Sequence, residues 1–351
     1  MVKTEILELK HGVQKHWKMI SIYSITHFFV DFACAFLMFF HISNTSEWYT
    51  SLLLYNFCAF AMQMPIGIIA DKLNRNHLFA AAGCVMIAAA YGLTSLPLVA
   101  AIVLGLGNGM FHIGGGIDIL NISEKKSSAL GIFISPGAFG VYFGTILGRT
   151  GASLTLPILI ALLIAAGMIF TMNRERVHTG TNVPNASFSP EVPPKLFIAV
   201  ICLFFVVCLR SYVGLAIDFP WKNTGYWGLA IVCASAFGKV LGGFLSDRYG
   251  PAKVAALSLG LAALLFLLPQ IPVAGVPAIL LFNMTMPITL WLIARMVPGA
   301  KGFSFGLLTF ALFLGFLPVY LGTDVPPFWV FAPLAAISLV LLMLVQRIRN
   351  N

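Results

Sequence analysis

Several ionisable side chains lie in the middle of long apolar segments, where a charge is costly unless it faces a cavity or a partner. Asp31 lies within such a segment, and His27 precedes it by one helical turn, which puts both on the same helical face. A carboxylate there could carry a proton, because a low dielectric disfavours its charged form. The alternative is a structural acid paired with His27 or Arg210. We expect Asp31 and His27 to form a proton-coupling pair.

A second set of polar side chains lies in other apolar segments and could contact a solute. Asn108 and His112 are one helical turn apart. Arg210 offers a fixed positive charge that would attract an anion, with snorkelling or pairing with Asp31 as the alternatives. We interpret Lys239 as a snorkelling residue that reaches a membrane face. The candidate solute-binding residues are Asn108, His112, Arg210, Tyr212 and Asn283.

One short motif occurs twice, half a chain apart, each time between two apolar segments. The copies read Gly67-Ile-Ile-Ala-Asp71-Lys72-Leu-Asn74-Arg75 and Gly243-Phe-Leu-Ser-Asp247-Arg248-Tyr-Gly250. The first glycine of each copy permits close helix packing. Each acid follows a helix whose C-terminal dipole disfavours it, so it needs a neighbouring helix N-terminus or a base as partner. An ordinary charged turn is the alternative to our prediction, a conformational latch made of Gly67, Asp71, Lys72, Arg75, Gly243, Asp247, Arg248 and Gly250.

These residues must be positioned by helices in a membrane. The chain is 59% hydrophobic and 9% charged, with a mean hydropathy of +0.94, far more apolar than a soluble domain. About 20 apolar residues cross the hydrocarbon layer as a helix. We therefore predict an all-α polytopic membrane protein with twelve transmembrane helices, at 17–40, 49–70, 77–95, 97–119, 127–148, 152–172, 195–217, 225–246, 252–269, 272–294, 302–322 and 326–346.

The distribution of basic residues predicts the orientation of these helices. If they alternate in direction, 17 of the 21 Lys and Arg residues fall on one face, which the positive-inside rule assigns to the cytoplasm together with both termini. The net charge of +9 then describes a membrane face, and no nucleic-acid partner is expected. The motif repeat predicts two pseudo-symmetric six-helix bundles, residues 1–172 and 195–351, joined by a polar cytoplasmic linker at 173–194. All six cysteines lie in apolar runs and are expected to be free thiols.

The repeated motif and its position resemble the signature of the major facilitator superfamily. In members of that family the signature recurs, more weakly, in the second half of the chain. Within it, His27-Phe-Phe-Val-Asp31, Gln63-Met-Pro65, Gly109-Met-Phe-His112 and Pro136-Gly-Ala-Phe-Gly140 look like the fosmidomycin-resistance branch. Departures are Asn74 in place of the motif's second glycine and Ile113 where the branch has a proline. The segment Gly131-x-x-x-Ser135-Pro136-x-x-x-Gly140 resembles the helix 5 motif of antiporters, with Gly131, Pro136 and Gly140 as a hinge.

The resemblance implies a secondary active transporter of small solutes that works by alternating access and couples to protons. Its branch implies export of a drug or metabolite by an antiporter in the bacterial inner membrane. The alternatives are a proton-linked importer of a small organic anion and a non-transporting membrane sensor. We expect a monomer with no cofactor, no metal site and no enzymatic activity, because the sequence has no nucleotide-binding loop, HExxH or Cys/His cluster.

Overall fold

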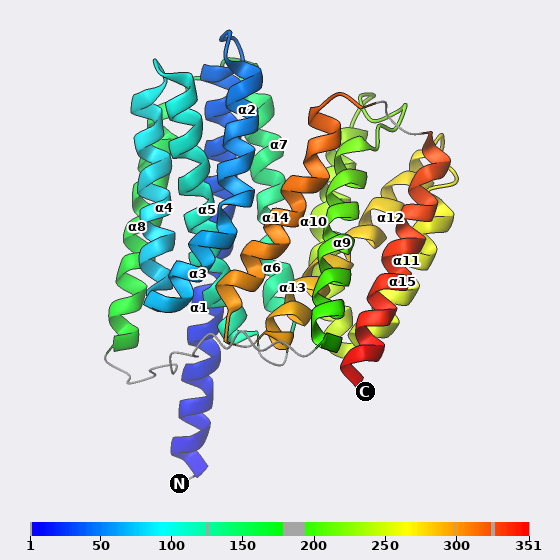
Figure 1. Ribbon diagram of the computed structural model, residues 1–351. Helices are drawn as coiled ribbons and strands as arrows, with labels where there is room; N and C mark the ends of the chain where they lie inside the picture. Colours follow the sequence, from blue (N-terminus) through cyan, green and yellow to red (C-terminus); the bar gives the residue numbers. More distant parts are fainter. Residues whose placement is uncertain (1, 124–125, 178–193, 298, 324–326, 351) are drawn as a thin grey trace.

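The computed structural model describes residues 2–123, 126–177, 194–297, 299–323 and 327–350, and its regular elements there are all helical (Figure 1). The first half contains α1 (Val2–Leu37), η1 (Met38–Ile42), α2 (Trp48–Asn56), η2 (Phe57–Ala61), α3 (Gln63–Leu73), α4 (Asn76–Ala90), η3 (Tyr91–Leu93), α5 (Pro97–Ile122), α6 (Ser128–Ile134), α7 (Pro136–Arg149) and α8 (Thr155–Val177). The second half contains α9 (Pro194–Ala216), α10 (Trp227–Tyr249), α11 (Pro251–Leu265), α12 (Pro272–Asn283), α13 (Thr285–Met296), α14 (Lys301–Tyr320), η4 (Phe328–Val330) and α15 (Phe331–Asn350).

Consecutive helices combine into the twelve predicted spans. In the described part of the chain, 11 helical segments are long and apolar enough to cross a membrane. The remaining span is α11, whose 15 helical residues are fewer than expected; at 1.5 Å per residue they cover about 22 Å. The prediction of an all-α polytopic membrane protein is therefore confirmed.

Three spans are broken close to a proline, which removes a helical hydrogen bond. The second breaks at Met62 between η2 and α3, three residues before Pro65. The fifth span breaks at Ser135 between α6 and α7, directly before Pro136. The tenth breaks at Met284 between α12 and α13, three residues before Pro287. A proline ring collides with the carbonyl of the preceding turn, which places the break on its N-terminal side.

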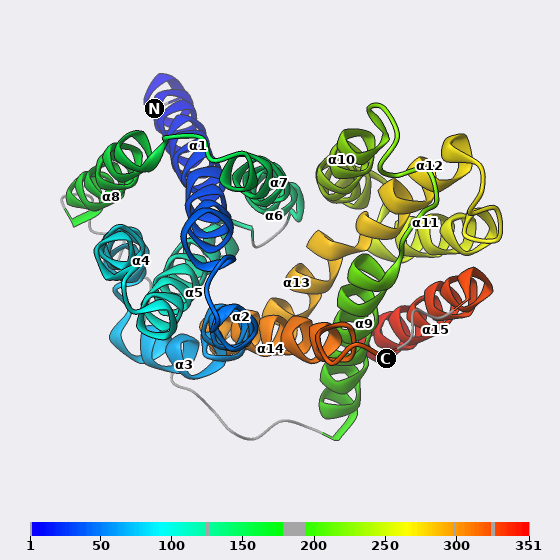
Figure 2. The ribbon, with the colours of Figure 1, turned by 90° about the horizontal axis from the view of Figure 1, so that it is seen from above.

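The helices form two groups, α1–α8 and α9–α15 (Figure 2). The groups meet where α14 packs against α3 and η2, and where α10 packs against α6 and α7. The predicted linker at 173–194 differs from the structure at its edges, because α8 runs on to Val177 and α9 begins at Pro194. Residues 178–193 lie outside the described residues. The two-domain boundaries stay a prediction.

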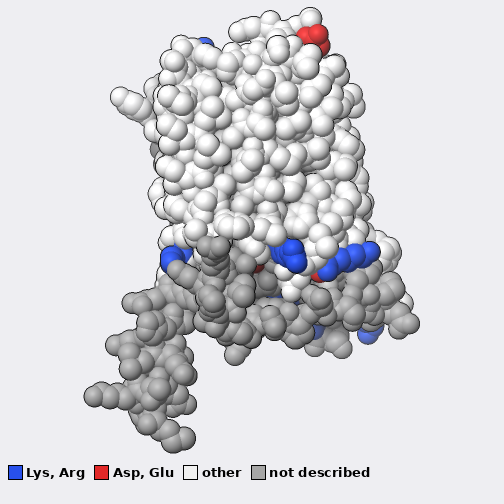
Figure 3. All heavy atoms as spheres, turned by 90° about the vertical axis from the view of Figure 1, so that its left-hand side faces the viewer, with Lys and Arg blue, Asp and Glu red and all other residues white. Residues whose placement is uncertain are grey.

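Both chain termini lie at one end of the molecule (Figure 1), here called the terminal end. On the face shown in Figure 3, most of the visible Lys and Arg side chains lie near that end, and a broad band without charged residues separates them from one basic and one acidic patch at the opposite end. The band is the apolar surface that lipid would cover. The six cysteines are free, as predicted.

Candidate functional site

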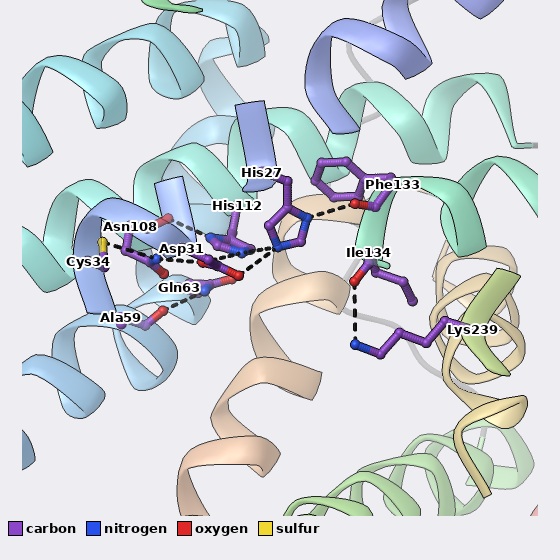
Figure 4. A network of polar contacts seen from close by, with 10 residues as sticks. All are labelled: His27, Asp31, Cys34, Ala59, Gln63, Asn108, His112, Phe133, Ile134 and Lys239. Atoms are coloured by element: carbon purple, nitrogen blue, oxygen red, sulfur yellow. Dashed lines mark hydrogen bonds and ion pairs between the residues drawn. The ribbon is translucent and has the colours of Figure 1, made fainter. Parts of the chain in front are cut away.

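Asp31 lies at the centre of a buried polar cluster formed by α1 and α5. Its Oδ2 atom is 3.1 Å from His27 Nε2, one turn earlier on α1. Its Oδ1 atom is 3.7 Å from His112 Nε2 and accepts a hydrogen bond of 3.1 Å from Asn108 Nδ2, both on α5. Figure 4 shows these four side chains pointing toward one another. We call Asp31, His27 and His112 the histidine cluster.

The ring orientation of both histidines is fixed by backbone carbonyls. His27 Nδ1 lies 2.7 Å from the carbonyl oxygen of Phe133, and His112 Nδ1 lies 2.9 Å from that of Asn108. A carbonyl only accepts, so each Nδ1 carries a proton and donates it. The two Nε2 atoms then face each other at 2.9 Å. Two lone pairs cannot form such a contact, so the geometry corresponds to a cluster with one additional shared proton.

The three ligand atoms of the histidine cluster lie within 4.8 Å of one another, close enough to be considered for a metal ion; the expectation that the chain has no metal site stays a prediction. The sequence did not reveal this group, since His112 comes from another helix. Two nitrogens that bond one tetrahedral zinc ion at its usual bond length lie about 3.3 Å apart. The nitrogens here are 2.9 Å apart, so a proton fits the cluster as it stands and a metal ion would have to spread it.

The broken fifth span packs its glycines against the cluster and its helix. A Cβ atom added at Gly137 would collide with Asp31 Oδ2 and His27 Nε2, and one added at Gly140 would collide with the carbonyl oxygen of Phe28. Gly131 packs in the same way on the backbone of Lys239 in α10. The predicted hinge residues Gly131, Pro136 and Gly140 thus stand at close helix contacts and at the helix break; their role as a hinge stays a prediction.

A cavity of about 210 Å³ opens between the two helix groups and contains the histidine cluster. It is smaller than the roughly 300–1,000 Å³ of pockets for drug-sized ligands, which favours a small solute. Its polar wall is formed by His27, Asp31, Gln63, His112, Arg210, Lys239, Thr289 and Thr309. Its apolar wall includes Val141, Val207, Met286, Leu290, Phe305, Leu308 and Leu312.

The predicted solute-binding residues separate into two classes. His112 and Arg210 line the cavity. Asn108 is buried behind Asp31, to which it is hydrogen-bonded. Tyr212 and Asn283 are not among the lining residues; Asn283 donates instead to the carbonyl of Ile279 in its own helix.

Helix geometry explains why Tyr212 cannot accompany Arg210. Residues two apart on a helix point about 200° away from each other. With Arg210 facing the cavity, Tyr212 packs against the hydrophobic core at α9. Tyr212 and Asn283 therefore do not line this cavity, and their part in solute binding stays a prediction.

Arg210 is not paired with Asp31, which resolves the alternative that the sequence left open. Its guanidinium donates to Thr285 Oγ1 at 2.9 Å and to Thr289 Oγ1 at 3.2 Å. Both threonines belong to α13, behind the helix break at Met284. Nothing in the sequence singles them out, because neither is ionisable or part of a motif.

Lys239 and Gln63 are cavity residues that the sequence analysis missed. Lys239 does not snorkel: its side chain is 8% exposed and reaches toward the carbonyl of Ile134, 3.5 Å away (Figure 4). Gln63 Nε2 donates to the carbonyl of Ala59, and its Oε1 atom is buried without a partner. The position of Lys239 along α10 could have indicated its burial, because Lys239 lies two turns before Asp247, the acid at the end of the helix.

The first latch acid binds the N-terminus of a helix in the other group. Asp71, near the end of α3, accepts hydrogen bonds from the backbone N–H groups of Gly302 at 2.8 Å and Phe303 at 2.9 Å, in the first turn of α14. A helix N-terminus attracts negative charge and leaves its first N–H groups free for such contacts. Gly67 permits the contact, because an added Cβ would collide with the carbonyl of Gly302.

The second latch acid makes the reciprocal contact. Asp247, near the end of α10, accepts from the N–H groups of Ser127 at 2.6 Å and Ser128 at 3.1 Å and from Ser127 Oγ at 3.0 Å, at the start of α6. Gly243 lies against the backbone of Ser127 and Ser128. Each group thus caps one helix of the other, and both caps lie on the side where the helices of the repeated motif end.

The basic residues of the motif are exposed: Lys72, Arg75 and Arg248. Arg248 lies over the ring of its neighbour Tyr249, with its guanidinium carbon 5.3 Å from the ring centre. The turn residues behave as the motif predicts, with Asn74 at a φ of 51° and Gly250 at 92°. The partners of the acids in the latch are therefore helix N-termini.

Comparisons with known proteins identify the fold. No protein-family model and no curated protein matches the chain. Solved structures do: a variant of the E. coli fucose:proton symporter FucP matches with a TM-score of 0.60 and 14% identity over 92% of this chain and 97% of that one. FucP in the outward conformation gives a TM-score of 0.59 and 15% identity over 92% and 97%. A bacterial homologue of the iron transporter ferroportin, outward-facing with soaked iron, gives 0.59 and 15% over 95% and 98%. The chain therefore has the major facilitator fold.

Proposed function

We propose that this protein is a proton-coupled secondary active transporter of a small solute. The observation that carries the proposal is the histidine cluster, which needs a shared proton between His27 and His112 and faces the cavity between the two helix groups. A proton site and a solute cavity that share one space can influence each other's occupancy, which is the requirement for coupling. The likeness to a fucose:proton symporter supports it. The proposal includes no catalytic role.

The two latches support alternating access. Both hold the groups together at one side of the cavity, through hydrogen bonds that break when the groups separate there. We assign that side and both termini to the cytoplasmic face of a bacterial inner membrane. The two bundles are residues 1–172 and 195–351, and the protein works as a monomer. In this assignment the described conformation is closed toward the cytoplasm.

The direction of transport separates two candidates. The first candidate is export of a drug or metabolite, which rests on the resemblance to the fosmidomycin-resistance branch. The second candidate is import of a small organic anion together with protons. It is favoured by the buried guanidinium of Arg210 in the cavity wall. Antiport moves solute against the proton flow and symport moves it along, so one assay distinguishes them.

The proposal is tested by transport in proteoliposomes with an imposed pH gradient and a panel of small labelled anions, cations and neutral solutes. We expect at least one solute to move above its equilibrium distribution and to relax when a protonophore is added. Movement toward the alkaline side identifies symport, and movement toward the acidic side identifies antiport. Protein-free liposomes correct for leakage. Exchange of a solute without any response to the pH gradient would contradict proton coupling.

A further inference from the structure

Two buried cations in the cavity wall have no acidic partner. Arg210 is 6% exposed and donates to the neutral hydroxyls of Thr285 and Thr289. Lys239 is 8% exposed and reaches only a carbonyl at 3.5 Å, the outer limit of a hydrogen bond. Within the described residues no carboxylate forms an ion pair with either side chain. A buried charge without a counter-charge is strongly unfavourable, so the pair needs an anion.

Asp31 does not supply that anion. Its carboxylate is occupied by His27, His112 and Asn108 on the α1–α5 side of the cavity. Arg210 and Lys239 come from α9 and α10 on the other side, and Figure 4 shows the Lys239 ammonium apart from the cluster. We infer that Arg210 and Lys239 form a binding site for the negative head of a small organic anion, and that this anion moves together with a proton on the histidine cluster.

The chemistry of the wall defines the class of anion. A guanidinium has five N–H donors, and two of its nitrogens are used by the threonines, so donors remain for a carboxylate or a similar planar head. Beyond the cations and the hydroxyls of Thr289 and Thr309, the same side of the wall is mostly apolar, with Met286, Leu290, Leu308 and Leu312. Such a surface suits an apolar body and offers few partners to the hydroxyls of a sugar. The ligand class is therefore an organic monoanion with a short aliphatic or aromatic body.

The charges around the cavity determine how the anion and the proton interact. Lys239 lies close enough to Asp31 and Arg210 for both charges to act on it. The titratable and charged groups that face Asp31 are His27 from α1, His112 from α5, Lys239 from α10, and the thiol and phenol of Cys34 and Tyr55. An anion bound beside this set adds a negative charge, which favours the protonated cluster. By linkage the protonated cluster binds the anion more tightly, so the two move in the same direction.

The inference rests on the proposed function and deepens it, and its test is binding to the purified full-length protein. Isothermal titration calorimetry would use butyrate, hexanoate, benzoate and phenylacetate, each against its neutral amide. We expect at least one acid to bind, and its amide to bind at least tenfold more weakly because charged hydrogen bonds are lost. In weakly buffered solution at neutral pH, binding of the acid is expected to take up protons.

A variant pair separates the site from general charge effects. Lys239→Met is expected to weaken binding of the acid about tenfold or more, whereas Lys222→Met is expected to leave it unchanged. Lys222 is a matched control, because it also belongs to the second group but forms an exposed ion pair with Asp218. Asp31→Asn is expected to lose the proton uptake that accompanies binding of the acid.

Two results would overturn the inference: an amide that binds as tightly as its acid, or no binding by any of the four acids. If a neutral or cationic solute is nevertheless driven by a pH gradient in proteoliposomes, the inference fails and the proposed function stands. If the acids bind with proton uptake but no solute responds to the gradient, the anion site stands and the proposed function fails.

Discussion

Asp31→Asn is expected to abolish accumulation of solute driven by a pH gradient while solute exchange remains measurable. Asparagine has the shape of aspartate and can still accept the hydrogen bond from Asn108. It cannot carry a proton itself, and it removes the negative charge that stabilises the proton shared by the two histidines. Coupling requires only that proton and solute change each other's binding free energy by about 1–3 kcal/mol. This variant is expected to remove that mutual effect.

The measurement compares uphill accumulation with counterflow exchange in the same proteoliposomes. Asp118→Asn is the matched control, because Asp118 is a buried carboxylate of α5 that accepts from Tyr23 and Asn76 and does not line the cavity. We expect this control to keep proton-driven accumulation. Should Asp31→Asn still move solute uphill, Asp31 is structural and the proton site must lie on His27 and His112 alone.

Replacing both Asp71 and Asp247 with Asn is expected to lower the rate of turnover at least tenfold and to leave solute affinity almost unchanged. Each acid holds two backbone N–H groups of the opposite helix group. Hydrogen bonds to a charged group contribute about 1.5–3 kcal/mol each, and an amide oxygen can replace one of them without its charge. The conformation closed at the latches would lose population, which slows the return step of the cycle.

The single variants separate the two latches, with Asp71→Asn expected to slow turnover by itself. Asp218→Asn is the control, since that acid forms an exposed pair with Lys222 outside both latches. Kinetics of exchange at saturating and limiting solute give turnover and affinity separately. A large loss of affinity with normal turnover would place the acids in solute binding, contrary to this account.

Local spacing in the sequence predicted the parts of the site that lie on one helix. His27 and Asp31 are four residues apart and meet as expected. The repeated motif predicted close glycine contacts and a helix N-terminus or base as partner for each acid. Which helix supplies that N-terminus depends on how the two groups pack, so α14 and α6 could not be identified from the motif.

Contacts between helices were the part that the sequence could not supply. His112 joins Asp31 only because α5 crosses α1 at that depth, and the phase of α9 decides that Arg210 faces the cavity while Tyr212 does not. Lys239 was assigned to a membrane face because its depth was judged from the helix end. Its burial beside Ile134 depends on α6, a helix that the break at Ser135 redirects.

The most direct test of proton coupling reverses the driving force. Proteoliposomes without a pH gradient carry an internal pH indicator, and a gradient of the solute identified in the transport panel is imposed across them. The account predicts a change of internal pH that follows solute movement, that is acid when an organic anion enters, and that disappears in Asp31→Asn and in protein-free liposomes. Solute movement through the wild-type protein with no accompanying change of internal pH would contradict it.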